Sequence, residues 1–312
     1  MSALTYSVGV DIGGTKIAAA IINEKGEVQT RHEISSMPND REKMFEQVAA
    51  CIEQVIRNAG LDYADIHGLG VGLPGKVDRQ QGVAVFQNNI AWTDFPIVER
   101  LKSRFPIDRI VIDNDVYMAA YGEWNCSTPK AAETFVYATV STGISCATIH
   151  QGAFVRGGGF AGEIGLLPAR TPSSWKQERA TLEQVAAGPA IERYAQEILQ
   201  NPELDSKEFF RQYADGNFEA SVLLEEIADS LARAFYSIVC LLDPQKIVVG
   251  GGVINHQPQL LELIKDALAK YVTPEQAHIV AAIHTSTLKG NSGVVGAALK
   301  AMELPKLQEI KQ

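Results

Sequence analysis

The sequence contains no long apolar run and no basic leader. No stretch approaches the roughly 18 consecutive apolar residues that a membrane-spanning helix needs. A secretory signal would show a basic segment followed by an apolar one, and the first residues have neither. These absences predict a cytoplasmic protein without a membrane partner.

Cysteine is scarce and scattered. The four cysteines, which form no CxxC pair and no regular framework, are Cys51, Cys126, Cys146 and Cys240. This distribution fits a reducing cytoplasm. Structural zinc sites use closely spaced cysteines and histidines, so no cysteine-based metal site is expected.

Positive charge is in deficit. The chain has 28 Lys and Arg against 37 Asp and Glu, a formal net charge of -9, and it shows no basic stripe. A nucleic-acid partner is therefore not expected. The remaining composition, 46% hydrophobic and 21% charged, is that of a globular protein, and 312 residues suggest two domains.

Strands and helices alternate along the chain, and the pattern occurs twice. Predicted strands are 6–12, 16–22, 27–34, 67–73, 109–112, 135–140, 144–149, a short one after Gly152, 246–249 and 279–284. Predicted helices are one with apolar spacing over 44–56, a short one near 95–105, one after 115, several within 182–242, one after 252 and one after 293. A loop is expected between 73 and 95.

Each half opens with a strand, a polar turn and a second strand, which indicates a weak internal duplication. The expected architecture is α/β, with mixed sheets covered by helices. We predict domains at 1–118 and 119–312, with the last helix, about 293–304, packing back on the first domain. Ligands of such folds bind beyond the carboxyl ends of strands, so a crevice between the halves is expected.

Two glycine hairpins are candidate phosphate sites. In VDIGGTK, the glycines at 13 and 14 let backbone N–H groups approach an anion, and Thr15 adds a hydroxyl. VSTGIS holds the matching place in the second half. Either turn alone has a structural explanation, but two of them facing one crevice favour a bound nucleotide.

A third glycine segment, VVGGGVIN, ends a strand before a helix. It is either a tight strand–helix connection or a flat backbone surface for an adenine or ribose. The two hairpins favour the interpretation that this segment binds an adenine or ribose.

Three polar residues stand where a strand passes into a helix, in VIDNDVYMAA. A helix cap accounts for one of Asp113, Asn114 and Asp115. A carboxylate at a helix start stays ionised and can take a proton from a hydroxyl that attacks phosphorus. The amide of Asn114 suits a sugar hydroxyl.

The order of these motifs resembles the ROK family of sugar kinases, within the actin/hexokinase-like superfamily. The matching stretches are DIGGTK, GLPGKVD, NNIAW, DNDVYMAAYGE, STGI, GFAGEIG, LEQVAAG, DPQKIVVGGGV and GNSGVVGAA. They span nearly the whole chain. The resemblance implies a duplicated fold of two domains around a cleft, and transfer of phosphate from ATP to the 6-hydroxyl of a hexose or N-acylhexosamine.

The resemblance also implies a role for each matching residue. Asp115 corresponds to the catalytic base. The implied sugar ligands are Gly75, Asn89, Asn114, Asp115, Glu163 and Glu183. The implied nucleotide residues are Asp11, Gly13, Gly14, Thr15, Lys16, Thr142, Gly143, Gly250, Gly251 and Gly252. Magnesium would enter with ATP near Asp11. A homodimer is expected by analogy with the family.

The sequence departs from the family pattern at two places. Zinc-bearing members have a histidine where this chain has Leu166, followed by a cysteine-rich segment, whereas RTPSSWKQERATLE has neither Cys nor His. No zinc is therefore expected, and the sugar pocket beside Leu166 is either more apolar or completed by another residue. STGISCA replaces a glycine-rich run, and its small side chains either continue a strand or crowd the phosphate.

Several functions stay open. N-acetylmannosamine and glucose are the leading acceptors, with fructose and glucosides as alternatives. A sugar-binding protein that no longer turns over would explain STGISCA. A sugar-responsive repressor would need a DNA-binding module before the sugar domain, and the first hairpin begins at Asp11, which leaves no room for one.

Overall fold

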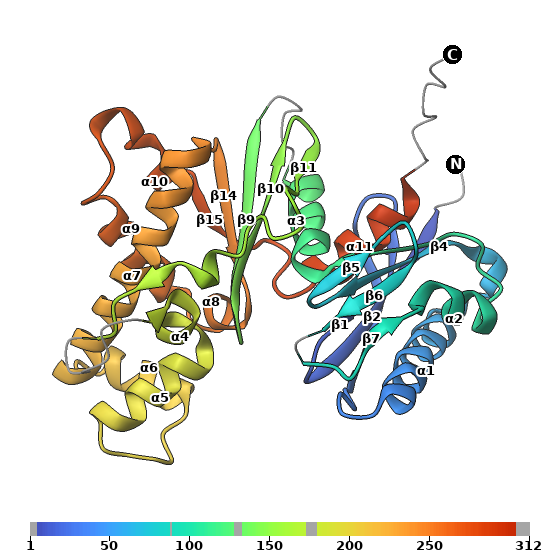
Figure 1. The fold of residues 1–312 in the computed structure, drawn as a ribbon, viewed down its shortest axis with the longest axis horizontal. Helices are drawn as coiled ribbons and strands as arrows, with labels where there is room; N and C mark the ends of the chain where they lie inside the picture. Colours follow the sequence, from blue (N-terminus) through green and yellow to red (C-terminus); the bar gives the residue numbers. More distant parts are fainter. Residues whose placement is uncertain (1–4, 88, 128–132, 173–179, 304–312) are drawn as a thin grey trace. The chain divides into compact units, whose positions relative to one another are not determined.

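The structure is a computed structural model that describes residues 5–87, 89–127, 133–172 and 180–303 (Figure 1). Its contacts group the chain into two compact units, 1–128 with 291–312 and 129–290. Helix α3 (Asp115–Cys126) runs through residue 118, so the boundary expected there falls inside a helix.

Unit 1 contains a five-stranded sheet and helices on both of its faces. Its elements are β1 (Tyr6–Ile12), β2 (Lys16–Asn23), β3 (Val28–Ser35), α1 (Arg41–Ala59), a 3₁₀ turn (Tyr63–Asp65), β4 (Ile66–Leu73), β5 (Lys76–Asp78), β6 (Val83–Phe86), β7 (Thr93–Phe95), α2 (Ile97–Arg104), β8 (Ile110–Asn114), α3 and α11 (Ser292–Met302). The strand order is β3-β2-β1-β4-β8.

Unit 2 repeats this arrangement and adds helices. Its elements are β9 (Thr134–Val140), β10 (Ile144–His150), β11 (Ala153–Val155), a 3₁₀ turn (Ile164–Leu166), β12 (Pro168–Ala169), β13 (Ala180–Thr181), α4 (Leu182–Ala186), α5 (Gly188–Ile198), α6 (Ser206–Ala214), α7 (Phe218–Leu242), β14 (Lys246–Gly250), α8 (Gly252–His256), α9 (Gln259–Leu268), a 3₁₀ turn (Pro274–Gln276), α10 (His278–Ala281) and β15 (Ile283–Thr285). The order β11-β10-β9-β14-β15 matches that of unit 1.

The two sheets also share strand directions. In each, the first two strands of the half form an antiparallel hairpin, and two further strands add in parallel, β4 and β8 in unit 1 and β14 and β15 in unit 2. The predicted duplication and α/β class are confirmed.

The core of unit 1 follows from alternation along its strands. Val8 and Val10 of β1 are buried in one cluster with α1, whose apolar residues recur at helical spacing. Between them, Gly9 points to the other face, where a Cβ atom would come within 1.8 Å of the Val294 carbonyl oxygen. Glycine there lets α11 pack directly on the strand backbone. In Figure 1, α11 is the red helix beside the blue strands of this unit.

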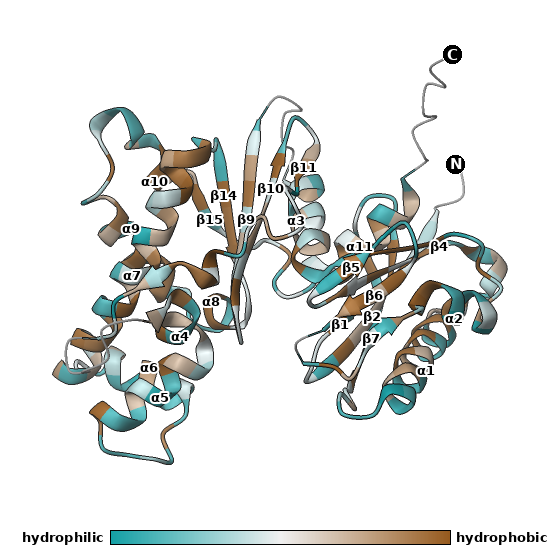
Figure 2. Ribbon diagram, viewed as in Figure 1, coloured by the Kyte–Doolittle hydropathy of each residue, from teal (hydrophilic) through white to brown (hydrophobic). Residues whose placement is uncertain are grey.

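The core of unit 2 is built mainly from α7 and the central strands. Helix α7 buries a stripe that includes Leu223, Ile227, Leu231 and Phe235, and it packs with α9 and the sheet. Figure 2 shows β14 largely in brown, as expected for a central strand whose residues are mostly buried.

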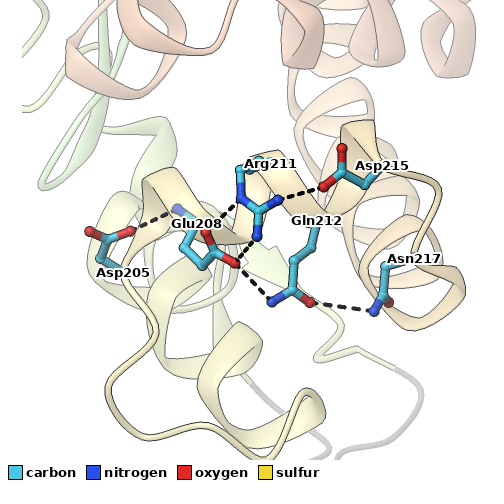
Figure 3. Close-up of polar contacts among 6 residues, drawn as sticks. All are labelled: Asp205, Glu208, Arg211, Gln212, Asp215 and Asn217. Carbon is cyan, nitrogen blue, oxygen red and sulfur yellow. Dashed lines mark hydrogen bonds and ion pairs between the residues drawn. The ribbon is translucent and has the colours of Figure 1, made fainter.

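Surface polar contacts fix the helical part of unit 2 around α6 (Figure 3). Asp205 caps the helix by accepting from the backbone N–H of Glu208 at 2.7 Å, and Arg211 pairs with Glu208 at 2.6 Å and Asp215 at 2.7 Å. Asn217 caps the next helix, α7. Exposed ion pairs stabilise by only about 0–1 kcal/mol each, so these contacts set helix ends more than overall stability.

Two secondary-structure predictions are wrong. The region expected as a loop between 73 and 95 contains the small sheet β5-β6-β7, because strands of three or four residues are too short to show alternation. The strand expected at 279–284 begins as helix α10, and only Ile283–Thr285 is a strand. The apolar run from Ile279 to Ile283 has no period that separates the two states.

No helix in the described ranges is long and apolar enough to cross a bilayer.

Candidate active site

The first predicted phosphate turn lies between β1 and β2. Its carbonyl groups are held within the protein: Gly13 N donates to Lys16 O at 2.9 Å, and Ser36 donates from Oγ to Gly13 O at 2.6 Å and from its N–H to Thr15 O at 3.0 Å. Among the described residues, nothing accepts a hydrogen bond from the N–H groups of Gly14 and Thr15. Two such donors at a hairpin tip suit an anion.

Asp11 stands at the end of β1 behind this turn. Burial raises the pKa of its carboxyl group from 3.8 to about 6, against the opposing effects of Lys16 and Arg31. Its carboxylate touches the start of α11, where a Cβ atom on Gly293 would come within 2.6 Å of Asp11 Oδ2. A cation would compensate this desolvated charge.

The donor set fits magnesium that arrives with a nucleotide. Within the described ranges, no group of three or more His, Cys, Asp or Glu side chains could hold a metal ion. Mg²⁺ commonly takes one or two carboxylates together with substrate phosphates, and Asp11 beside the turn meets that pattern. Residues 173–179 of the segment that replaces the family's cysteine-rich run lie outside the described residues.

Lys16 is engaged in an ion pair. Its Nζ lies 3.1 Å from Glu33 Oε2, and its side chain is 61% exposed. Exposed pairs of this kind contribute only about 0–1 kcal/mol, so a phosphate competes readily for the ammonium group.

The three polar residues at the start of α3 differ in their burial and hydrogen bonds. Asp113 is buried and accepts from Asn114 N at 2.9 Å. Asn114 Oδ1 caps the helix, and its Nδ2 donates to Gly75 O at 3.1 Å. An amide nitrogen carries two hydrogens, so one of them remains for a ligand. Asp115 is the first residue of α3 and is half-buried.

The other two sugar residues predicted in unit 1 are Gly75, which contacts Asn114, and Asn89, which contacts the first hairpin. Gly75 has a φ of 73°, and a Cβ atom there would come within 2.3 Å of Phe86 O, so only glycine fits this turn. Asn89 is exposed and packs on the first hairpin, where a Cβ atom on Gly14 would come within 2.9 Å of Asn89 Cβ. Asn89 also lines an open cavity of about 540 Å³ with Pro38 and neighbouring residues.

In unit 2 the two predicted sugar glutamates act on one another. Both side chains are exposed, but partial desolvation and the nearby charge of Glu183 still raise the pKa of Glu163 above its ordinary value of 4.5. Glu183 Oε2 accepts from Ile144 N at 3.1 Å, at the start of β10. Two carboxylates that repel one another suit a ligand that donates several hydroxyl hydrogens.

The same Glu183 carboxylate touches the second glycine turn. A Cβ atom on Gly143 would come within 2.7 Å of Glu183 Oε2, and one on Gly165 within 3.3 Å. Thr142, between the strands at the tip of this turn, is exposed. The structure therefore brings one predicted sugar ligand and one predicted phosphate turn into direct contact.

The residues of STGISCA that depart from the family pattern lie in two places, the turn and the strand β10. Ser141 directs its Oγ to Gly143 O at 3.4 Å, inside the turn. Ser145, Cys146 and Ala147 lie in β10, which confirms that they continue the strand. Cys146 N donates to Gly162 O at 2.8 Å, which fixes the loop that carries Glu163.

Leu166 ends the 3₁₀ turn that follows Glu163, and its N–H donates to Glu163 O at 3.1 Å. It is 62% exposed, unusual for a leucine. An apolar surface therefore lies three residues from a predicted sugar ligand.

The three glycines after β14 have different surroundings. Cβ atoms on Gly250 and Gly251 would come within 2.5 Å of Tyr137 Oη and 2.3 Å of Val140 O, and Gly251 has a φ of 91°. A Cβ atom on Gly252 would meet nothing within 4 Å. Gly250 and Gly251 are thus required by packing, and Gly252 alone borders open space.

This difference predicts opposite outcomes for two neighbouring substitutions. Gly252→Ala should fold normally, because alanine suits the start of α8. If adenosine approaches Gly252, the added methyl should raise KM for ATP about fivefold, equivalent to about 1 kcal/mol, and leave the sugar KM unchanged. Steady-state kinetics with each substrate varied would show this. An unaltered ATP KM would place the adenosine elsewhere.

Gly251→Ala is the matched control, because its Cβ atom clashes with β9. It should lower the melting temperature and the yield of folded protein rather than act on ATP alone.

The predicted residues thus form one group in each unit. Asp11, the first hairpin, Gly75, Asn89 and the start of α3 belong to unit 1, and the two glutamates, the second turn and the glycine triplet to unit 2. A common cleft for both groups stays a prediction.

Sequence reasoning missed the residues that support this site. Ser36, Gly165 and Gly293 each touch a predicted ligand residue or turn. A serine after a strand and glycines inside longer motifs have no spacing that marks them in a sequence.

The duplicated sheets define the class of the protein, an α/β fold of the actin-like and hexokinase-like kind. The model of the ROK family matches residues 7–303, so the chain belongs to the ROK family.

Relatives that are named as sugar kinases match almost the whole chain. It is 29% identical over 309 residues to a glucokinase of Halalkalibacterium halodurans, covering 93% of each chain. It is 29% identical over 299 residues to an N-acetylmannosamine kinase of Escherichia fergusonii, covering 95% of this chain and 98% of the relative. A ROK family glucokinase from Streptomyces griseus, solved with glucose and AMPPNP, superposes with a TM-score of 0.78 at 26% identity, covering 94% of this chain and 98% of that chain.

Proposed function

We propose that this protein is an ATP-dependent sugar kinase that phosphorylates the 6-hydroxyl of a hexose or N-acylhexosamine. The observation that carries the proposal is the pair at the start of α3. Asp115 is the first residue of the helix, and Asn114, which caps it, has one amide hydrogen that is available to a ligand. This combination offers a proton acceptor next to a hydroxyl-binding group. Membership of the ROK family and its kinase relatives supports the same reaction.

Asp115 acts as general base in this proposal. It takes the proton of the 6-hydroxyl while that oxygen bonds to the γ-phosphorus, and the bond from phosphorus to the bridging oxygen of ADP breaks. Asn89, Asn114, Glu163 and Glu183 hold the other hydroxyl groups and orient the reacting one.

The glycine turns supply the nucleotide side. The N–H groups of Gly14 and Thr15 bind phosphate oxygens, as do Thr142 and Gly143 of the second turn. Magnesium, when bound with ATP, would neutralise phosphate charge, and Asp11 is the carboxylate of this chain that fits it.

N-acetylmannosamine and glucose are the leading acceptors. The exposed Leu166 offers apolar surface and no hydrogen bond, which suits the methyl group of an N-acetyl substituent. Kinases for both sugars occur among the relatives. We also propose a cytoplasmic location, which the free thiols of all four cysteines support, and a homodimer by analogy with the family.

Release of ADP over a panel of sugars tests the proposal. The panel is N-acetylmannosamine, glucose, fructose and a methyl glucoside, each with Mg²⁺ and ATP. We expect sugar-dependent release with at least one of the first two. If no sugar causes release, calorimetry with each sugar and with Mg·ATP follows, and sugar binding without nucleotide binding would identify a non-catalytic sugar-binding protein.

A further inference from the structure

The first turn of α11 touches the carboxylate predicted to lie near magnesium. Gly293 approaches Asp11 so closely that a Cβ atom would come within 2.6 Å of Oδ2 and 2.7 Å of Cγ. A contact that holds this turn in place therefore also holds Gly293 against the Asp11 carboxylate and limits where that carboxylate can move.

A buried hydrogen bond holds the same turn from its other side. Ser292, the first residue of α11, donates from Oγ to Glu123 Oε1 at 2.7 Å. Glu123 is completely buried and Ser292 is 4% exposed. A buried carboxylate is costly unless hydrogen-bonded, so its position in the core requires an explanation.

Helix α3 carries Glu123 about two turns beyond Asp115. It packs very closely on α11: a Cβ atom on Gly122 would come within 2.6 Å of Ser292 O, and one on Gly296 within 1.7 Å of Met118 O. The two helices cannot slide independently at this distance. Two motifs that are far apart in the sequence meet here, DNDVYMAAYGE through Gly122 and Glu123, and GNSGVVGAA through Ser292 and Gly293.

We infer that Glu123 is a positioning residue that, through Ser292 and the first turn of α11, holds Asp11 in place for the magnesium-bound nucleotide. The inference rests on the proposed function of Asp11. The carboxylate of Glu123 accepts from a side chain at a helix N-terminus, where negative charge is favourable. The turn is thus held between Asp11 on the sheet and Glu123 on α3.

Ser292→Ala tests this with little change in volume. We expect the Mg²⁺ concentration for half-maximal activity to rise about tenfold, as when a residue supporting a metal ligand is removed, with the sugar KM unchanged. Without metal or nucleotide, amide hydrogen exchange at 293–296 should become faster, because the turn loses its anchor. The separate variant Glu123→Gln keeps an oxygen acceptor for the Ser292 hydroxyl and should retain most of the wild-type Mg²⁺ response.

Glu303→Gln is the control at the other end of α11. Glu303 accepts from Tyr121 Oη and lies 2.5 Å from Lys300 Nζ. This variant should lower the melting temperature and leave the Mg²⁺ response and exchange at 293–296 unaltered. If Ser292→Ala behaves in the same way, Glu123 is merely structural and the inference is overturned.

Asp11→Asn separates the inference from the proposal beneath it. Full activity in Asp11→Asn would overturn the role of Asp11, and with it the inference. An inactive Asp11→Asn together with an ordinary Mg²⁺ response in Ser292→Ala would overturn the inference alone.

Discussion

Asp115→Asn should lower kcat by a factor of about 10²–10⁴, the usual contribution of a general base. Asparagine has the same shape and still begins α3, but its amide cannot take the proton of the attacking hydroxyl. The sugar KM should change little, because in the proposed function Asn89, Asn114 and the two glutamates hold the sugar. Steady-state kinetics, with sugar binding measured separately by calorimetry, would distinguish these effects.

Asp205→Asn is a matched control, since it makes the same chemical change at the start of α6 in the other unit. It should leave kcat unchanged. Full activity of Asp115→Asn would refute the assigned base, and a joint loss of kcat and sugar binding would instead make Asp115 a sugar ligand.

The fold was predictable wherever a strand or helix is long and periodic. Strand β1 was placed at its observed bounds, and the spacing of Met44, Val48 and Ile52 matches the buried face of α1. The short strands β5 to β7 could not be predicted, because pairing with one another stabilises them and each is too short to show an alternating hydrophobic pattern. Helix α10 escaped for the same physical reason, since its apolar run fits either state.

The placement of the candidate site residues on their elements was more predictable than the contacts that support them. Asp115 at a helix start follows from local sequence, because capping is a local interaction. The contact of Glu183 with Gly143 and Ile144 joins residues about forty positions apart, and no periodicity encodes it. The closeness of Gly293 to Asp11 joins opposite ends of the chain, so only the folded structure reveals it.

Glu163→Gln should weaken sugar binding while raising the melting temperature. A hydrogen bond to a charged acceptor contributes about 1.5–3 kcal/mol, so KM should rise roughly 10- to 100-fold. Partial desolvation and the charge of Glu183 raise the pKa of Glu163, so its ionised form is less favourable in the folded protein than in the unfolded chain, by an amount that the exposure of both side chains keeps small. Glutamine removes this unfavourable charge and keeps a similar shape.

The gain in stability should depend on pH with a definite sign. Because the folded pKa lies above the ordinary 4.5, the protonated form favours folding, and that contribution is lost as pH rises from 4.5 through the folded pKa. The melting temperatures of wild type and Glu163→Gln should therefore converge below about pH 4.5, diverge as the pH rises through the folded pKa, and differ by a constant amount above it. Calorimetric scans over this range, with the exposed Glu197→Gln in α5 as control, would measure the divergence.

The two readouts together decide what the Glu163–Glu183 pair is for. Weaker sugar binding with a higher melting temperature means that the fold holds an unfavourable pair of charges which the sugar's hydroxyl groups relieve on binding. A lower melting temperature would mean that Glu163 mainly holds its own loop in place. The stability of the free protein, and not activity alone, therefore tests whether this carboxylate is reserved for the ligand.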